Sequence, residues 1–147
     1  LEGSARIARL RGESGIARRR CQTAVQEAEA LPDPTTEAAR CRIQLSLIDL
    51  MEGRSAEAAA RYENATSGMP VDRSTFLDDP TDSASRASFL AHVGDSDAAF
   101  ALLDLAVGSG TVDAWTARNP DLAPLRGDPR WSGFTRRLRD GLERGGF

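Results

Sequence analysis

The stretch that decides the fold is residues 53–70, which read GRSAEAAARYENATSGMP. After the opening glycine, small or aromatic side chains recur at Ala58, Tyr62 and Ala65, at intervals of five, four and three residues. Intervals of three and four place residues on one face of an α-helix. Pro70 cannot continue such a helix. The stretch therefore predicts a glycine turn, an amphipathic helix and a stop.

A second helix is predicted directly before this one. Asp33 supplies an N-cap and Pro34 suits the first helical turn, and Gly53 ends the apolar pattern. Its apolar positions are Cys41, Leu45, Leu47, Ile48, Leu50 and Met51. Residues 36–70 are therefore expected to form an antiparallel helix pair.

This helix pair resembles the tetratricopeptide repeat. That family has a turn glycine, a small residue five positions later, an aromatic four further, an alanine three further and a proline five beyond. Every step is matched, by Gly53, Ala58, Tyr62, Ala65 and Pro70. The resemblance implies an α-solenoid, in which alanines let neighbouring helices approach closely. The preceding helix departs from the family at Arg42, where a bulky apolar residue is usual.

Two further copies are predicted. One follows a helix at about residues 83–92, with the same spacing at Gly94, Ala99, Leu103 and Ala106. The other, at the start of the chain, is degenerate. Its fitting residues after Gly15 are Cys21, Val25 and Ala28, one place late, which implies an altered turn at Gly12–Gly15.

Residues 119–131, NPDLAPLRGDPRW, give a second resemblance. They look like an ending that closes repeat arrays in bacterial multidomain proteins, including serine/threonine kinases, adenylate cyclases and winged-helix regulators. We expect a short helix at Val112–Arg118 that presents Trp115 to the array. Pro120 and Pro124 are expected to force an extended link.

A capping helix is expected after this link, with Asp128 as its N-cap and Pro129 in its first turn. Its apolar stripe recurs at intervals of three and four, which places it on one face; the stripe is Trp131, Phe134, Leu138 and Leu142. The face expected to be exposed to solvent, called the wet face, carries Arg136, Arg137 and Arg139. A terminal helix with one polar face is what a repeat array needs in order to end.

Charge and composition exclude several classes of function. The chain contains no lysine, which excludes a phosphate-loop lysine, a Schiff base and a lysine base. Residues 1–20 carry six Arg against two Glu, and residues 71–105 carry seven Asp against two Arg. The Arg-rich start favours a solvated helix face over a nucleic-acid site, because aromatic residues are not interleaved with it.

Other candidate sites have structural interpretations. Cys21 and Cys41 are expected to be buried thiols, which fits a cytoplasmic protein. No run of residues is apolar enough for a membrane span. His92, on which any catalytic triad would depend, stands at an ordinary turn. Glu57 and Glu63 are expected on an exposed helix face. A solvated loop, rather than a calcium site, is expected for Asp72, Asp78, Asp79 and Asp82. A helix terminator, rather than a phosphate-binding loop, is expected at Gly108–Gly110.

The predicted binding surface follows from the family resemblance, in which the first helix of each pair lines a concave groove for peptides. The matching residues are Arg40, Ile43, Gln44, Leu47, Leu50 and Met51. This set is mostly apolar and favours an apolar or helical segment over a carboxylate. Two alternatives stay open: the groove is open to a partner, or these residues pack against the N-terminal helices or other domains of the same polypeptide.

The sequence thus predicts one all-α domain, an α-solenoid of about three helix pairs with a capping helix. The expected parts are a degenerate pair at 1–35, a pair at 36–70, a loop at 71–82, a pair at 83–110, and a short helix with the capping helix at 111–147. The expected function is a non-catalytic protein–protein interaction scaffold without cofactor or metal, at the C-terminal part of a larger bacterial signalling protein. The alternative is a regulatory domain of a transcription regulator or of a ligand-responsive protein, whose Arg-rich start contacts nucleic acid or an effector domain.

Overall fold

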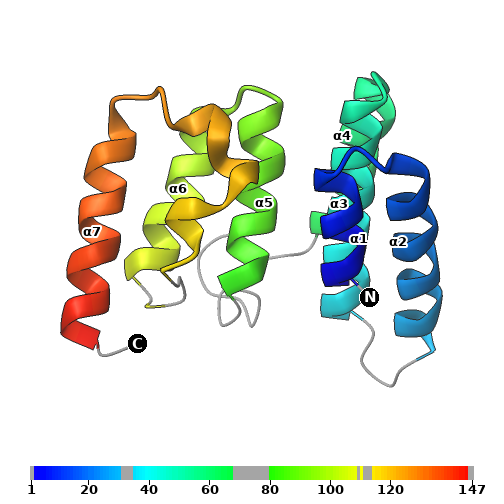
Figure 1. The fold of residues 1–147 in the computed structure, drawn as a ribbon, viewed down its shortest axis with the longest axis horizontal. Helices are drawn as coiled ribbons and strands as arrows, with labels where there is room; N and C mark the ends of the chain where they lie inside the picture. The colour runs from blue at the N-terminus through cyan, green and yellow to red at the C-terminus, as the bar shows by residue number, and fades with distance from the viewer. Residues whose placement is uncertain (1, 31–34, 68–79, 109, 111–113, 146–147) are drawn as a thin grey trace. The chain divides into compact units, whose positions relative to one another are not determined.

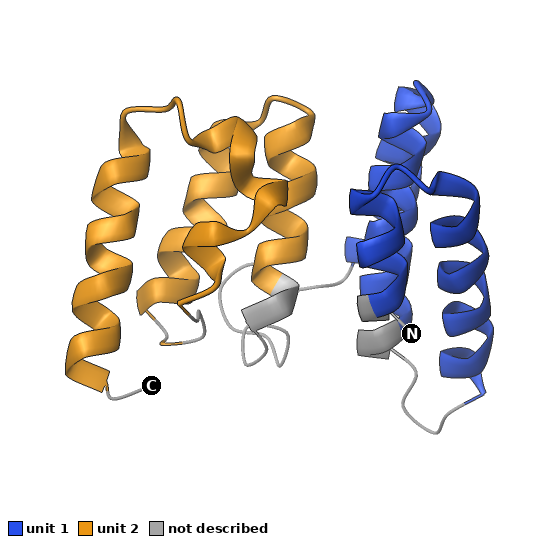
Figure 2. Ribbon diagram, in the orientation of Figure 1, with its two compact units in different colours: residues 1–68 blue, residues 69–147 orange. Residues whose placement is uncertain are grey.

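The structure is a computed structural model that describes the backbone of residues 2–30, 35–67, 80–108, 110 and 114–145. These residues form α-helices and 3-10 helices, and none of them lies in a strand (Figure 1). Contacts divide the chain into two compact units, residues 1–68 and residues 69–147 (Figure 2). The all-α class is confirmed, whereas the solenoid arrangement and the single domain stay predictions.

Unit 1 consists of two antiparallel helix pairs. The first pair is α1 (Glu2–Leu10) and α2 (Ser14–Glu29), and the second is α3 (Thr35–Met51) and α4 (Ser55–Thr66). Helix α3 packs against α2 and α4, and α1 packs against α2 and α3. Small side chains of the first pair receive larger ones from α3; this core is Ala5, Ala8, Ala17, Cys21, Leu45 and Ile48.

Three turns of the same construction join the paired helices. Gly12, Gly53 and Gly94 each have a positive φ, of 77°, 77° and 84°, a conformation that glycine adopts without a Cβ penalty. In each turn the residue after the glycine donates its N–H to a carbonyl five positions earlier, at 2.9, 2.8 and 2.9 Å. This is the hydrogen bond of a Schellman helix ending. The three glycines are 41 residues apart in both intervals.

The prediction of an altered turn at Gly12–Gly15 is therefore wrong. Gly15 lies inside α2, and Gly12 is the turn residue. Counted from Gly12, intervals of five, four and three lead to Ala17, Cys21 and Ala24, all of which are buried. The sequence places the repeat positions too far along the chain because Gly12 and Gly15 are close together and the count starts from Gly15. Only the positive φ shows that the turn requires Gly12.

Unit 2 contains the third helix pair, α5 (Pro80–His92) and α6 (Ser96–Gly108), followed by the 3-10 helices η1 (Thr116–Arg118) and η2 (Pro120–Leu125) and by α7 (Arg130–Gly145). Helix α5 packs against α6 and η2, and α6 packs against α7. The core residues come from all four of these elements: Ala87, Ala91, Ala99, Phe100, Leu103, Ala106, Leu122, Leu125, Phe134 and Leu138.

The segment with two prolines differs from the expected extended link. Residues Pro120–Leu125 form a 3-10 helix that Asn119 caps, with its Oδ1 accepting the N–H of Asp121 at 3.0 Å. The φ that proline imposes suits a 3-10 helix as well as an extended chain. Leu122 and Leu125, three residues apart, then fall on one side and enter the core.

The predicted C-terminal helix is confirmed as α7, whereas its role in ending a repeat array stays a prediction. The Asp128 Oδ1 accepts the N–H of Arg130 at 2.9 Å, so the side chain of Asp128 caps the start of α7. Phe134 and Leu138 are buried, and Trp131 and Leu142 pack against the same core. The residues of the expected wet face, Arg136, Arg137 and Arg139, are exposed.

The packing of Trp115 on the array stays a prediction. The side chain is 47% exposed, and the buried residue of this segment is Thr116. Most of the loop expected at 71–82, with Asp72, Asp78 and Asp79, and the stop at Pro70 fall on residues 68–79, outside the described chain. The last three residues expected in that loop are helical instead, because α5 begins at Pro80. The side chain of Asp82 and the helix start predicted at Asp33 and Pro34 are also outside the described chain.

Candidate functional site: a groove on unit 1

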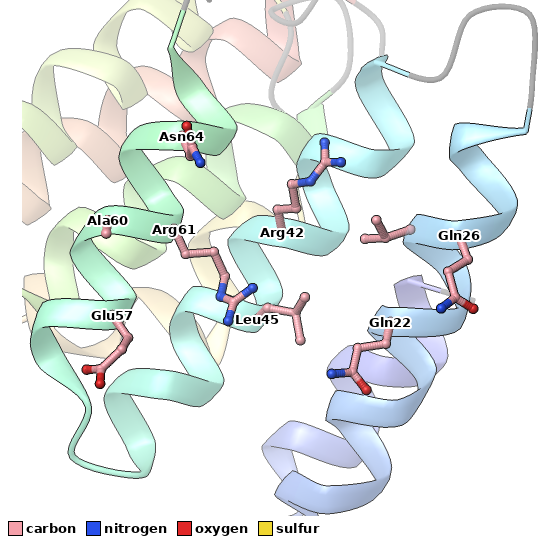
Figure 3. A pocket seen from close by; sticks show the side chains of 9 residues that line it. Gln22, Gln26, Arg42, Leu45, Glu57, Ala60, Arg61 and Asn64 are labelled. Carbon is pink, nitrogen blue, oxygen red and sulfur yellow. The ribbon is translucent and has the colours of Figure 1, made fainter.

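A groove runs along unit 1, with α2 and α4 as its walls and α3 as its floor (Figure 3). Its volume is about 760 Å³, within the range of protein ligand pockets. Nine residues line it: Gln22, Val25, Gln26, Arg42, Leu45, Glu57, Ala60, Arg61 and Asn64. The groove forms because α3 sits between α2 and α4, so that the two outer helices stand apart above it.

The floor is aliphatic and the walls carry amides. Leu45 is a buried core residue that reaches the floor, whereas Gln22, Gln26 and Asn64 are exposed. Among the contacts of the described residues, these three amides take part in no hydrogen bond within the protein. Each amide has both a donor and an acceptor. The groove therefore offers hydrogen bonds of both kinds beside an apolar surface.

A buried ion cluster adjoins the groove lining through Arg61. Its centre is the carboxylate of Asp49, which is 1% exposed. Three arginines from different parts of unit 1 share it. Arg18 Nη2 of α2 lies 2.7 Å and Arg54 Nη2 lies 2.9 Å from Oδ1, and Arg61 Nε of α4 lies 2.8 Å from Oδ2. Arg18 Nη2 also lies 2.9 Å from Glu52 Oε2. Three positive charges thus meet two negative ones.

Electrostatics keep this carboxylate ionised. Burial alone would raise the pKa of Asp49, but hydrogen bonds from Arg18 and Arg61 and their positive charges outweigh it and hold the pKa below its usual value. The same contacts outweigh the effect of burial on Arg18 and raise the pKa of its guanidinium. Asp49 is therefore a structural anion and a poor proton acceptor.

Arg61 connects this cluster to the groove. Its Nε is bound to Asp49, while its side chain lies in the groove toward Leu45 (Figure 3). A guanidinium carries five N–H donors, and the contacts of the described residues use only the one on Nε. Arg42 lies on the floor and pairs with Glu29 of α2.

The predicted binding residues all lie on α3, but not in this groove. Ile43, Gln44 and Leu47 are buried, Arg40 and Leu50 are partly exposed, and Met51 is 51% exposed. Gln44 Oε1 accepts a hydrogen bond from Arg9 Nε of α1 at 3.0 Å, which fits the alternative that these residues pack on the N-terminal helices. The concave-groove assignment of this set stays a prediction.

Sequence reasoning missed the groove residues because exposed polar positions on a helix resemble a solvated face. A signal was present in the spacing. Gln22 and Gln26 are four apart on α2, and Glu57, Arg61 and Asn64 are four and three apart on α4. Each set makes a polar stripe on one helix face. Only the packing of both helices on α3 shows that the two stripes face one groove.

The other candidate residues lie elsewhere. His92 is the last residue of α5, exposed, with Nδ1 2.7 Å from the carbonyl oxygen of Ser88. Cys21 and Cys41 are buried, as expected. Glu57 and Glu63 are exposed, as expected. The described residues hold no group of three or more His, Cys, Asp or Glu suited to a metal ion.

No protein-family model, curated protein or solved structure matches this chain. The tetratricopeptide assignment accordingly stays a prediction. In the described part of the chain, every helix is too short or too polar to cross a membrane.

Proposed function

We propose that this protein is a non-catalytic protein–protein interaction module that holds a segment of a partner in the groove between α2 and α4. One observation carries the proposal: three amide side chains and Arg61 converge on a groove with an aliphatic floor. A peptide needs both features, because its backbone requires hydrogen-bond partners while its side chains gain from apolar contact.

The repeated helix pairs support this class of function. Three-residue connections with a Schellman ending recur at Gly12, Gly53 and Gly94 and fix the geometry within each pair. Helical repeats present extended surfaces on rigid elements, which suits recognition. A tetratricopeptide-type array, at the C-terminal part of a larger bacterial signalling protein, is the form of this module that we favour.

Two other functions gain less support. Acid–base catalysis in the groove would depend on Asp49 or Glu57, but Asp49 is bound to three guanidiniums and Glu57 is exposed. For nucleic-acid binding by the Arg-rich start, free cationic side chains are needed. Arg9 is buried against Gln44, Arg18 is paired with Asp49 and Glu52, and Arg20 donates to the carbonyl oxygen of Ser4. At least three of those six arginines are therefore used internally.

The test compares two exposed alanines on one helix. Ala60 lines the groove and its neighbour Ala59 does not. Ala60→Trp fills the groove without touching the core, and Ala59→Trp adds the same side chain outside it. Cross-linking pull-downs with quantitative mass spectrometry are expected to lose partners with Ala60→Trp and to retain them with Ala59→Trp. Equal recovery of every partner by the two variants would refute binding in the groove.

A further inference from the structure

The α4 wall of the groove on unit 1 carries two opposite charges, Glu57 and Arg61 (Figure 3). They are four residues apart, so they share one helix face and lie about 6 Å apart along its axis. In the part of the chain that the structure describes, Glu57 takes part in no ion pair or hydrogen bond. Arg61 binds Asp49 through Nε, and the contacts of the described residues leave its two Nη groups unused. The wall therefore offers one anion and the end of one cation to an occupant.

The amides of the groove favour an extended occupant over a helix. Gln22 and Gln26 of α2 and Asn64 of α4 are exposed and have no hydrogen-bond partner among the described residues. The backbone N–H and C=O groups of an extended chain need partners, whereas a helix satisfies its own. Gln22 and Gln26 are four residues apart, about 6 Å along α2. An extended chain repeats every two residues, about 6.7 Å, so its successive backbone groups match successive amides.

The same repeat sets the spacing of the charges that the occupant carries. In an extended segment, side chains two residues apart point to the same side and lie about 6.7 Å apart. That distance is close to the rise of about 6 Å between Glu57 and Arg61. An acid opposite Arg61 and a base opposite Glu57 therefore stand two positions apart in the segment.

The 147 residues of this chain do not supply such a segment themselves. The described residues lie in helices or in turns of a few residues, in unit 2 as in unit 1. Among the remaining positions of the sequence, the basic residue is Arg73, and neither Val71 nor Thr75, two positions from it, is an acid. The charge pattern of the groove thus fits a segment from outside these residues.

We propose that the partner segment in the groove is extended and carries an acidic and a basic side chain two positions apart, the acid bound by Arg61 and the base by Glu57. The inference rests on the proposed function and names the chemistry that the groove selects. Asp49 acts through Arg61. Its contact with Nε holds the guanidinium in place, so that the two Nη groups can bind a carboxylate in a bidentate manner.

Selection from a displayed library of random peptides tests this chemistry without a known partner. The wild-type chain is expected to enrich peptides with an acid and a base two positions apart, relative to Ala60→Trp, in which the new side chain fills the groove. Arg61→Gln should lose the enrichment of the acid and keep that of the base. Glu57→Gln should do the reverse. Enrichment at a spacing of four residues would overturn the extended form, because that spacing places side chains on one helix face.

An affinity cycle tests whether Arg61 binds the acid directly. With a selected peptide, fluorescence anisotropy should show that Arg61→Gln weakens binding about fivefold, equivalent to about 1 kcal/mol, as for a partly exposed ion pair. Replacing the acid of the peptide by its amide should weaken binding to wild type equally, and should not weaken binding to Arg61→Gln further. Independent effects of the two replacements would overturn the contact.

Arg54→Gln is the matched control, because Arg54 also binds Asp49 but does not line the groove. It should retain the affinity of wild type and its preference for the acid. A fivefold loss in this variant as well would show that the ion cluster shapes the groove as a whole, and would overturn the direct role of Arg61.

The library also separates this inference from the proposed function. If wild type enriches no peptide above Ala60→Trp, binding in the groove is refuted and the inference falls with it. If wild type enriches peptides that lack the pair of charges, the inference alone is refuted, and the groove remains a site for a partner segment.

Discussion

Arg18 Nη2 lies 2.7 Å from Asp49 Oδ1, and this contact joins α2 to α3 across 31 residues of sequence. The carboxylate is 1% exposed and the arginine side chain 20% exposed, so the pair is largely withdrawn from water. Arg54 and Arg61 bind the same carboxylate, which links α4 to the two earlier helices. One buried aspartate therefore joins α2, α3 and α4 beside Arg61, a residue of the groove lining.

Asp49→Asn should destabilise unit 1 by about 3 kcal/mol, because it keeps the size of the side chain but leaves three arginines around a neutral group. Urea unfolding followed by circular dichroism measures the change. The control is Asp104→Asn, at a surface ion pair with Arg137 whose side chains are about half exposed. That substitution should cost less than about 1 kcal/mol. Equal effects of the two substitutions would contradict the role assigned to Asp49.

Acid should weaken the same cluster. The pKa of Asp49 is lower in the folded protein than in the unfolded chain, so its contribution to stability is fully present above the ordinary value of 3.8. It is lost as the pH falls through the lowered folded pKa. Asp49→Asn should therefore reduce the pH dependence of the free energy of unfolding below pH 3.8. A variant with the same acid dependence as wild type would show that other carboxylates cause it.

Asp128 should titrate well below an ordinary aspartate. Hydrogen bonds from the side chain and the backbone N–H of Arg130 lower the pKa of Asp128 from 3.8 to about 2. Its cap on α7 should hold above pH 3.8 and be lost as the pH falls toward 2. NMR titration of the carboxyl carbon checks the midpoint. In Arg130→Gln the titration midpoint of Asp128 should rise toward 3.8. A midpoint still near 2 would show that the Arg130 side chain is not the main cause of the lowered pKa.

Two glycines at the start of the chain should respond to alanine in opposite ways. Gly12→Ala places a Cβ at a φ of 77° and should cost about 1–2 kcal/mol. Gly15→Ala lies inside α2, where the new Cβ would lie 3.8 Å from Arg19 Nη1, an ordinary contact. It should add about 1 kcal/mol through helix propensity. Thermal unfolding of both variants tests which glycine forms the turn. A Gly15→Ala variant less stable than Gly12→Ala would assign the turn to Gly15.

Truncation to Ala should destabilise the protein more at Phe134, beside Trp131, than at Trp115. Phe134 is buried beside Trp131, with a distance of 5.2 Å between the ring centroids. Phe134→Ala should lower the free energy of unfolding by about 3–5 kcal/mol. Trp115→Ala, at a side chain that is 47% exposed, should cost clearly less, about 1 kcal/mol. Chemical denaturation measures both. A large loss at Trp115 would show that it packs on the protein after all.

Local patterns were the reliable part of the sequence. Intervals of three and four located the buried side of α7 at Phe134 and Leu138, and Asp128 marked its start. Errors arose where two local solutions have similar energies. Either Gly12 or Gly15 can end a helix, and prolines such as Pro120 and Pro124 suit both an extended chain and a 3-10 helix. The burial of Leu122 and Leu125 in the core selects the helix.

The sequence by itself determined that the chain is helical and that two of the helix pairs turn at Gly53 and Gly94, because helix periodicity, caps and glycine conformation act within a few residues. The tertiary structure decided which polar residues share a surface. Gln22 and Asn64 are 42 positions apart in the sequence and line one groove because α3 packs between their helices. In the same way, Asp49 carries no local mark of its three arginine partners, since ion pairs across 31 residues form only after the helices have packed.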